Sequence, residues 1–240
     1  GQANTPTTNS FTNLDGSIQS NVSPNTISRF SIVKWTGNAG NATVGHGLGV
    51  VPKMIIFKNL PQTEGWIVYH QAISNTHFLP LNTDGALVDN ATMFNDTSPT
   101  GSVFSVGSNH GTNGPNHAMI AYCFGDVQGF SKMGSYTGNG NADGPFVYTG
   151  FKPAFILIRR TTPGTSWQIQ DNKRLGYNVG ESNLFPDTTG AEAGGKGLDI
   201  LSNGFKARST SGANNSSGNT FIYMAFAENP FTSSAGTPVT

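Results

Sequence analysis

The run Gly45-His46-Gly47-Leu48-Gly49 has the composition of a glycine loop that binds phosphate. In nucleotide-binding folds a strand precedes such glycines and a helix follows them, so that the helix N-terminus faces the phosphates. Here the order is reversed, because the glycines precede the apolar run Met54-Ile55-Ile56-Phe57, with Pro52 in between. No helical pattern follows, and the G-x-x-x-x-G-K-[ST] motif is absent. We therefore expect no nucleotide site and no cofactor.

The five histidines are the next candidates, because imidazole nitrogens are common metal ligands. His70 and His77 are seven residues apart, as are His110 and His117, whereas His46 lies by itself. Zinc ligands usually come in tighter pairs with cysteines or carboxylates nearby. We therefore expect surface or turn histidines and assign no metal ligand.

Residues 139–144, with the sequence NGNADG, resemble the start of a calcium-binding loop. The EF-hand pattern needs a glutamate six residues after its glycine. That position is Gly150, so the motif is incomplete. An irregular calcium site remains an alternative.

Carboxylates could hydrolyse a glycosidic bond, since a pair about 5–10 Å apart needs no local motif. Asp126 and Glu228 match each other across the internal repeat described below, so we expect them to be architectural. The G-x-S-x-G and H-E-x-x-H motifs are absent. We assign no catalytic residue, and hydrolysis of a polysaccharide stays an alternative function.

Three tryptophans, Trp35, Trp66 and Trp167, could stack on sugar rings. Trp66 and Trp167 are equivalent in the internal repeat, which favours a shared place in a core or an interface. Sugar binding by these rings remains the alternative.

The elements that must position these residues occur twice. Gly49 and Pro52, before an apolar run, reappear as Gly150 and Pro153, an offset of 101 residues (150 − 49). The same register aligns Trp35–Asn38 with Tyr136–Asn139, and an offset of 102 aligns Ile120, Phe124 and Asp126 with Ile222, Phe226 and Glu228. A fixed period over this length predicts two copies of one unit. The Gly-x-x-Pro segment then becomes a corner before the most apolar strand of each copy.

Short apolar runs separated by Gly, Asn, Asp and Pro predict an all-β fold of two tandem β-sandwich units, jelly-roll-like in kind. The expected strands are residues 30–35, 54–58, 66–70, 78–81, 102–106, 117–124, 134–136, 155–160, 166–170, 182–185, 204–208 and 220–227. We place an extended N-terminal arm at residues 1–28, the first unit at 29–131, the second at 132–232 and a C-terminal tail at 233–240.

The composition narrows the function classes. Charged residues number 26 of 240 (13 + 13) and the formal net charge is zero, so no broad field attracts nucleic acid or an anionic membrane. No apolar stretch has the length, about 20 residues, that crosses a bilayer. The single cysteine, Cys123, lies in an apolar run and is expected to be a buried hydrophobe. The chain does not begin with Met, which suggests processing or a fragment of a longer protein.

Several segments together resemble a domain of tailed-phage structural proteins, especially marine ones. They are FSIVKWTGN, ATVGHGLGVVPKMIIFKN, WIVYH, IAYCFGDVQGFSKMGSYTGNGNADGPFVYTGFKPAFILIRR and FIYMAFAENPF. The similarity extends from about Asp15 to Phe231. It implies a place on the virion, in a tail fibre, tail spike or head decoration, and β-sandwich units that oligomerise. It brings no catalytic residues.

We therefore expect a non-enzymatic virion protein, in a tail fibre or receptor-binding module that contacts the host cell surface. Loops 107–116 and 209–219, rich in Gly, Asn and Ser, are expected to contact a host glycan, although no individual ligand-binding residue can be assigned. Other virion proteins are expected partners, and trimerisation is a guess from fibre architecture. The alternatives are a capsid-decoration or tail-lattice protein that binds other virion subunits, and a polysaccharide depolymerase.

Overall fold

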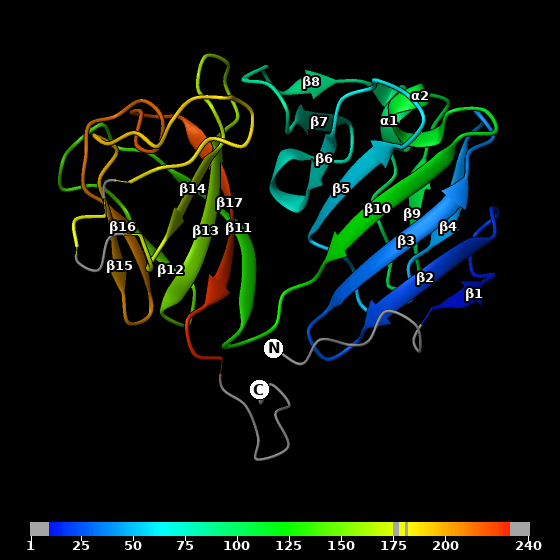
Figure 1. Ribbon diagram of the computed structural model, residues 1–240, viewed down its shortest axis with the longest axis horizontal. Coiled ribbons are helices and arrows are strands. Elements are labelled where there is room, and N and C mark those ends of the chain that lie inside the picture. Colours follow the sequence, from blue (N-terminus) through cyan, green and yellow to red (C-terminus); the bar gives the residue numbers. More distant parts are fainter. Residues whose placement is uncertain (1–9, 175–177, 181, 231–240) are drawn as a thin grey trace. The chain divides into compact units, whose positions relative to one another are not determined.

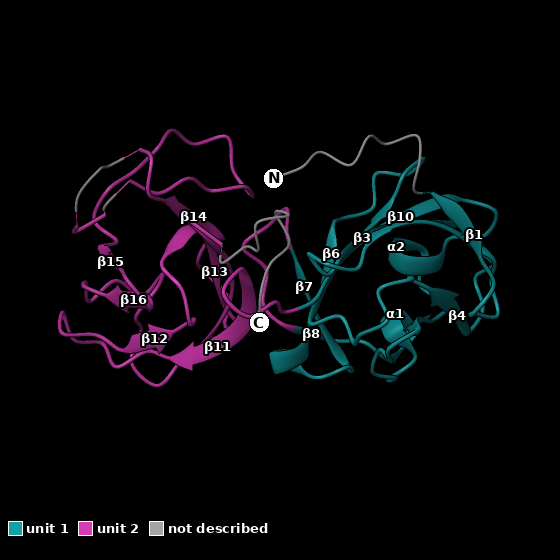
Figure 2. Ribbon diagram, turned by 90° about the horizontal axis from the view of Figure 1, so that it is seen from below, with its two compact units in different colours: residues 1–80, 88–125 teal, residues 81–87, 126–240 magenta. Residues whose placement is uncertain are grey.

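A computed structural model describes residues 10–174, 178–180 and 182–230, and these residues form an almost entirely β structure (Figure 1). Two compact units divide the chain. Unit 1 comprises residues 1–80 and 88–125, and unit 2 comprises residues 81–87 and 126–240 (Figure 2). The expected all-β class is confirmed. No helix in the described part of the chain is long and apolar enough to span a membrane.

Unit 1 contains an eight-stranded antiparallel sheet. Its order is β1 (Phe11–Asn13), β2 (Ser20–Asn25), β3 (Phe30–Thr36), β10 (Ala118–Phe124), β5 (Met54–Asn59), β6 (Ile67–His70), β7 (His77–Pro80) and β8 (Val88–Asp89). A two-stranded sheet pairs β4 (Ala42–Gly45) with β9 (Val103–Val106). The short helices are η1 (Gln71–Ile73), α1 (Ala91–Phe94) and α2 (His110–Asn113). An asparagine side chain accepts from the first turn of α1 and of α2.

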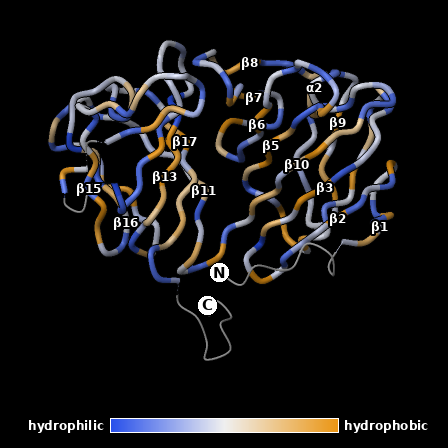
Figure 3. The backbone as a smooth tube through the Cα atoms, viewed as in Figure 1, coloured by the Kyte–Doolittle hydropathy of each residue, from blue (hydrophilic) through white to orange (hydrophobic). Residues whose placement is uncertain are grey.

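The core of unit 1 lies between these two sheets. Trp35 of β3 meets Phe57 of β5 edge-on, with ring centroids 6.3 Å apart, and Phe104 of β9 with centroids 5.5 Å apart. Hydrophobic residues are concentrated on such central strands (Figure 3). Because the apolar faces of both sheets share one core, the unit is sandwich-like.

Unit 2 has a four-stranded sheet of order β11 (Ser131–Thr137), β17 (Thr220–Ala227), β13 (Pro153–Arg160) and β14 (Gln168–Asp171). A three-stranded sheet has the order β12 (Phe146–Tyr148), β16 (Gly204–Ala207) and β15 (Leu198–Leu201). Phe205 of β16 meets Tyr136 and Tyr223 of the larger sheet, with ring centroids 5.8 and 5.3 Å apart. A core between two sheets is therefore present here too.

The two units share their strand order. The sequence β3-β10-β5-β6 in unit 1 corresponds to β11-β17-β13-β14 in unit 2. A hydrogen bond from the Gln71 amide to the Lys53 carbonyl, 2.8 Å long, recurs 101 residues later from Asn172 to Ala154 at 3.1 Å. These matches support our inference that one unit was duplicated.

The glycine corner is the backbone feature that the repeat predicts. Gly49 and Gly150 both have positive φ angles, 69° and 85°, a conformation that favours glycine. Pro153 is the first residue of β13, and Pro52 lies just before β5. The segment is therefore a sheet corner used in both units.

Several predicted boundaries differ from the structure. Within the predicted arm, residues 11–25 supply β1 and β2, and β2 pairs with β3 along its whole length. The segment is polar, but Val22 is buried, so tertiary pairing overrides its composition. The chain passes between the units after residues 80, 87 and 125, whereas the predicted boundary lies between residues 131 and 132. Residues 182–185 form only isolated bridges. Residues 1–9 and the predicted tail 233–240 lie outside the described residues.

Candidate binding face on the second unit

His46, in the glycine segment, is a buried structural residue. Its Nδ1 accepts a hydrogen bond from the Leu48 amide at 3.2 Å, and its Nε2 lies 3.1 Å from the Thr100 carbonyl oxygen. This pattern places the proton on Nε2, because Nδ1 acts as acceptor. Burial lowers the pKa of the imidazole. A neutral histidine thus holds the corner together, which is the turn place among the surface or turn positions expected for the histidines.

His70 is also buried and caps a turn. Its Nδ1 accepts from the Ala72 amide at 3.1 Å. At the equivalent position in unit 2, a carboxylate oxygen of Asp171 accepts from the Lys173 amide at 2.9 Å. The same cap is therefore made by different side chains, and His70 is a buried turn residue rather than a surface one.

The other histidines contact polar neighbours. Nδ1 of His77 lies 2.6 Å from the Thr76 hydroxyl, and Nδ1 of His117 lies 3.0 Å from the Asn59 amide nitrogen. The rings of His110 and His117 have centroids 6.2 Å apart. Within the described ranges, no three His, Cys, Asp or Glu side chains gather as metal ligands do.

The calcium-like segment uses its side-chain oxygens internally. Oδ1 of Asn139 accepts from the Asn141 amide, and Oδ1 of Asn141 accepts from the Asp143 amide, both at 2.9 Å. The carboxylate of Asp143 pairs with Lys206 at 2.8 Å. These bonds make the segment a polar turn whose side-chain oxygens already have protein partners.

The architectural interpretation of Asp126 and Glu228 agrees with their contacts. A carboxylate oxygen of Asp126 accepts from the Met133 amide at 2.8 Å, and Glu228 pairs with Lys152 at 2.6 Å. The Asp126 carboxylate therefore holds a backbone amide, and the Glu228 carboxylate holds a lysine side chain. Each carboxylate follows the last strand of its sequence repeat.

Two of the three tryptophans belong to the cores. Trp35 and Trp167 are buried, as the core interpretation expects, while Trp66 is half-buried and stacks on Tyr122 with centroids 6.4 Å apart. Cys123 is buried as predicted, and burial raises the pKa of its thiol. None of these groups presents a broad exposed ring.

The two loops expected to contact a ligand have buried residues at their centres. Thr112 and Asn113 are buried in loop 107–116, and Asn214 and Asn215 are buried in loop 209–219. The buried amides hold the backbone of the loop, so they are unavailable to a ligand. The adaptable loops predicted from the composition are thus rigid in their middle parts.

A different surface of unit 2 does expose large aromatic rings. Phe146 and Tyr148 of β12 are 45% and 60% exposed, whereas Val147 between them is buried. Alternate residues of a strand point to the same face, so the two rings lie in line, about 7 Å apart along the strand. We call the outer face of the β12-β16-β15 sheet the aromatic face. Its exposed or partly exposed members are Phe146, Tyr148, Lys206, Arg208, Asp199 and Leu201.

Charged side chains flank the rings on this face. In the strand register, Phe146 lies opposite Lys206, and Lys206 lies opposite Asp199. The Lys206 ammonium lies 2.8 Å from a carboxylate oxygen of Asp143, and the guanidinium of Arg208 lies 3.3 Å from Asp199. These pairs orient hydrogen-bonding groups beside an apolar stripe.

Gly204 leaves the centre of the aromatic face without a projecting side chain. It is the cross-strand partner of Tyr148, and a Cβ at this position would lie 3.0 Å from a ring carbon of Phe146 and 2.1 Å from the Val147 carbonyl oxygen. Only a residue without a side chain fits, so the Phe146 ring can lie against β16.

A hollow adjoins Tyr148. It has a volume of about 330 Å³ and is lined by Asp126, Val127, Gln128, Ser131, Lys132, Tyr148, Thr149 and Gly150. The Lys132 ammonium lies 5.7 Å from the centre of the Tyr148 ring, within the range of a cation–π contact. The hollow therefore combines an exposed ring with donors and acceptors.

The equivalent positions of unit 1 carry no aromatic side chain. In the 101-residue register Gly45 and Gly47 stand where unit 2 has Phe146 and Tyr148. A Cβ at Gly45 would lie 1.8 Å from Oδ1 of Asn13, so the N-terminal segment covers this position. The difference between two glycines and two aromatic residues at these positions is visible in the sequence, but no role was predicted for Phe146 or Tyr148.

One acidic cluster in unit 2 could be mistaken for a hydrolase site. Burial raises the pKa of Asp187, and the nearby Arg159 guanidinium opposes that rise. Both carboxylate oxygens of Asp187 are enclosed by protein. Arg159 is itself buried and donates to Thr165 Oγ1 at 3.0 Å and to the Gly85 carbonyl. This geometry is that of an internal charge cluster, since a substrate cannot reach the carboxylate.

Comparison with known proteins yields one match. The family model described as "Domain of unknown function (DUF7483)" matches residues 4–230. No curated protein and no solved structure matches the chain.

Proposed function

We propose that the chain, which belongs to the DUF7483 family of domains of unknown function, is a non-enzymatic module of a tailed-phage virion. Because the family has no known function, the role is argued from the chain's own residues. In this proposal the module belongs to a tail fibre or receptor-binding structure and binds polysaccharide on the host cell surface through the aromatic face. The observation that carries it is the exposure of Phe146 and Tyr148 in one line on a sheet.

The chemistry of the face suits a sugar chain. A pyranose ring has an apolar C–H face that packs on an aromatic ring, and hydroxyls at its edge that need hydrogen-bond partners. Two rings on alternate residues of β12 can meet successive sugars, while Lys206 and Arg208 supply donors alongside. The strands also hold the rings rigidly, which lowers the entropy lost on binding.

The virion part of the proposal rests on other features. The resemblance to tailed-phage structural proteins extends over residues 15–231, and the surface is soluble through Asn, Ser, Thr and Gly rather than through charge. Partners in the proposal are other virion proteins and further copies of the chain.

Two alternatives remain. In a capsid-decoration or tail-lattice protein, the aromatic face would bind another virion subunit, since exposed aromatic stripes also mark protein interfaces. A depolymerase would cleave the polysaccharide as well as bind it. Release of reducing sugar from host polysaccharide would favour the depolymerase, and labelling of the chain at the capsid face in images of the particle would favour decoration.

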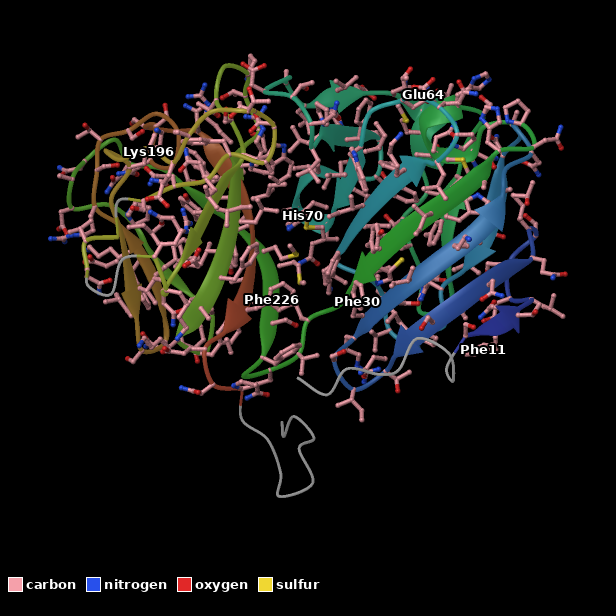
Figure 4. All side chains as sticks on the ribbon, viewed as in Figure 1. Phe11, Phe30, Glu64, His70, Lys196 and Phe226 are labelled. Atoms are coloured by element: carbon pink, nitrogen blue, oxygen red, sulfur yellow. The ribbon has the colours of Figure 1, made fainter. Side chains whose placement is uncertain are left out.

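The test is binding to an array of bacterial capsular and lipopolysaccharide O-chain glycans. We expect the wild-type protein to bind at least one glycan, and the Phe146→Ala/Tyr148→Ala double variant to lose at least tenfold in affinity. Phe11→Ala is the matched control, because Phe11 is 50% exposed on β1 of unit 1 and is labelled in Figure 4. Equal binding by all three proteins would contradict the proposal.

A further inference from the structure

The hollow beside Tyr148 contains a lysine, Lys132, whose ammonium lies near an aromatic ring rather than a carboxylate. Five other cations of unit 2, Lys152, Lys173, Arg174, Lys206 and Arg208, have a carboxylate within 4 Å. Lys132 takes part in no ion pair among residues 10–174, 178–180 and 182–230. Its ammonium instead lies against the Tyr148 ring, at the rim of the hollow.

We infer that the polysaccharide bound by the aromatic face is acidic, with a uronate residue stacked on Tyr148 and its carboxylate paired with Lys132. This inference rests on the proposed function. In a uronic acid the carboxylate projects from the edge of the pyranose ring. A ring stacked on Tyr148 can therefore direct its carboxylate to an ammonium 5.7 Å from the centre of the aromatic ring.

The remaining groups of the hollow are compatible with this arrangement. Gln128 is exposed and offers both an amide donor and an acceptor to sugar hydroxyls. One oxygen of Asp126, the acidic group of the hollow, accepts from the Met133 amide at 2.8 Å. Its charge also acts on Tyr223, where burial first and Asp126 second raise the phenol pKa to about 12.

The volume of the hollow beside Tyr148 limits the size of the sugar unit that can enter it. A hollow of about 330 Å³ lies at the lower end of the range for ligand pockets. One sugar residue with its carboxylate fits such a space, and the Phe146 ring further along β12 is left for its neighbour in the chain. The hollow thus selects one acidic residue within a longer polymer.

The experiment compares polymers that differ only in charge. The probes are polygalacturonate, alginate and hyaluronan, each beside its fully methyl-esterified form, in which the carboxylates are neutral. We expect the wild-type protein to bind at least one acidic polymer ten or more times more tightly than its ester, and this preference to shrink as salt concentration rises. Lys132→Gln should remove the preference and Lys132→Arg should keep it.

Lys196→Gln is the matched control, because the Lys196 ammonium also lies over an aromatic ring, 4.9 Å from the centre of Phe185, in unit 2. This variant should keep the preference. Equal affinity of the wild-type protein for acid and ester, lost in Tyr148→Ala, would overturn the inference and leave the proposed function standing. A preference that persists in Lys132→Gln would overturn it as well. Binding to neither form of any of the three polymers would also overturn the inference, and binding on the glycan array would then still support the proposed function.

Discussion

Asn113 in unit 1 and Asn215 in unit 2 make the same hydrogen bonds, 102 residues apart. The amide nitrogen of Asn113 donates to Asn38 Oδ1 at 2.8 Å, to the Gly40 carbonyl at 2.7 Å and to the Gly107 carbonyl at 3.0 Å. That of Asn215 donates to Asn139 Oδ1 at 3.1 Å, to the Asn141 carbonyl at 2.6 Å and to the Ser209 carbonyl at 2.9 Å. Each side-chain oxygen also accepts from the amide of residue 38 or 139. One buried amide thus ties two loops together in each unit.

Replacement of Asn215 by alanine should destabilise unit 2. The variant leaves part-buried carbonyls without a donor, and a lost bond of this kind costs about 1–3 kcal/mol when its acceptor stays unsatisfied. We expect the free energy of unfolding to fall by about 2–4 kcal/mol in urea titrations followed by circular dichroism. Asn203→Ala is the control, because the Asn203 side chain is exposed. A loss of similar size in both variants would show that the hydrogen bonds of Asn215 have no special weight.

The pKa of His46 predicts a pH dependence. Burial depresses this pKa below its ordinary value near 6.5, so the folded state binds fewer protons than the unfolded state in the window below that value. Stability from His46 is therefore fully present above pH about 6.5 and declines as the pH falls below it. We expect the melting temperature to fall less between pH 7.5 and 5.5 in His46→Gln than in the wild type.

The control for this pH series is His110→Gln, which changes an exposed imidazole in the same unit. It should leave the wild-type slope intact. A slope that is the same in the wild type and in His46→Gln would mean that His46 does not govern the acid sensitivity of unit 1.

Gly37 lies in a close backbone approach that tolerates no side chain. A Cβ there would lie 2.1 Å from the Gly114 carbonyl oxygen, and the equivalent Gly138 has the same restriction, 2.3 Å from the Ser216 carbonyl oxygen. Gly37→Ala must displace backbone, so we expect a loss of about 1–3 kcal/mol in thermal unfolding. Gly40→Ala should cost less than 1 kcal/mol, because the nearest atom to its Cβ is 3.6 Å away. Equal losses would contradict this account of the close approach.

Much of the sheet could be predicted from the sequence. The apolar runs that became β3, β5, β10, β13 and β17 were placed within a few residues, because branched and aromatic residues are enriched in strands that bury at least one face. The corner glycines were correctly interpreted from their reversed order relative to the apolar run. The predicted repeat gave a register in which the strands of unit 1 can be compared with those of unit 2.

The surface of unit 2 could not be predicted in the same way. Phe146 and Tyr148 have the composition of core residues, and only the pairing of β12 with β16 decides which side of the strand faces solvent. Polar β2 was missed because its burial depends on β3 rather than on its own sequence. The four-residue helices α1 and α2 were missed as well, since an asparagine cap and local packing stabilise them.

The central claim is that the aromatic face of unit 2 is the surface that binds polysaccharide. Hydroxyl-radical footprinting with mass spectrometry measures it directly, since exposed aromatic side chains are oxidised and a bound ligand protects them. The account predicts that a glycan identified on the array lowers oxidation of Phe146 and Tyr148 severalfold and leaves Phe11, exposed on unit 1, unchanged. Unchanged oxidation of Phe146 and Tyr148 in the presence of bound glycan would contradict it.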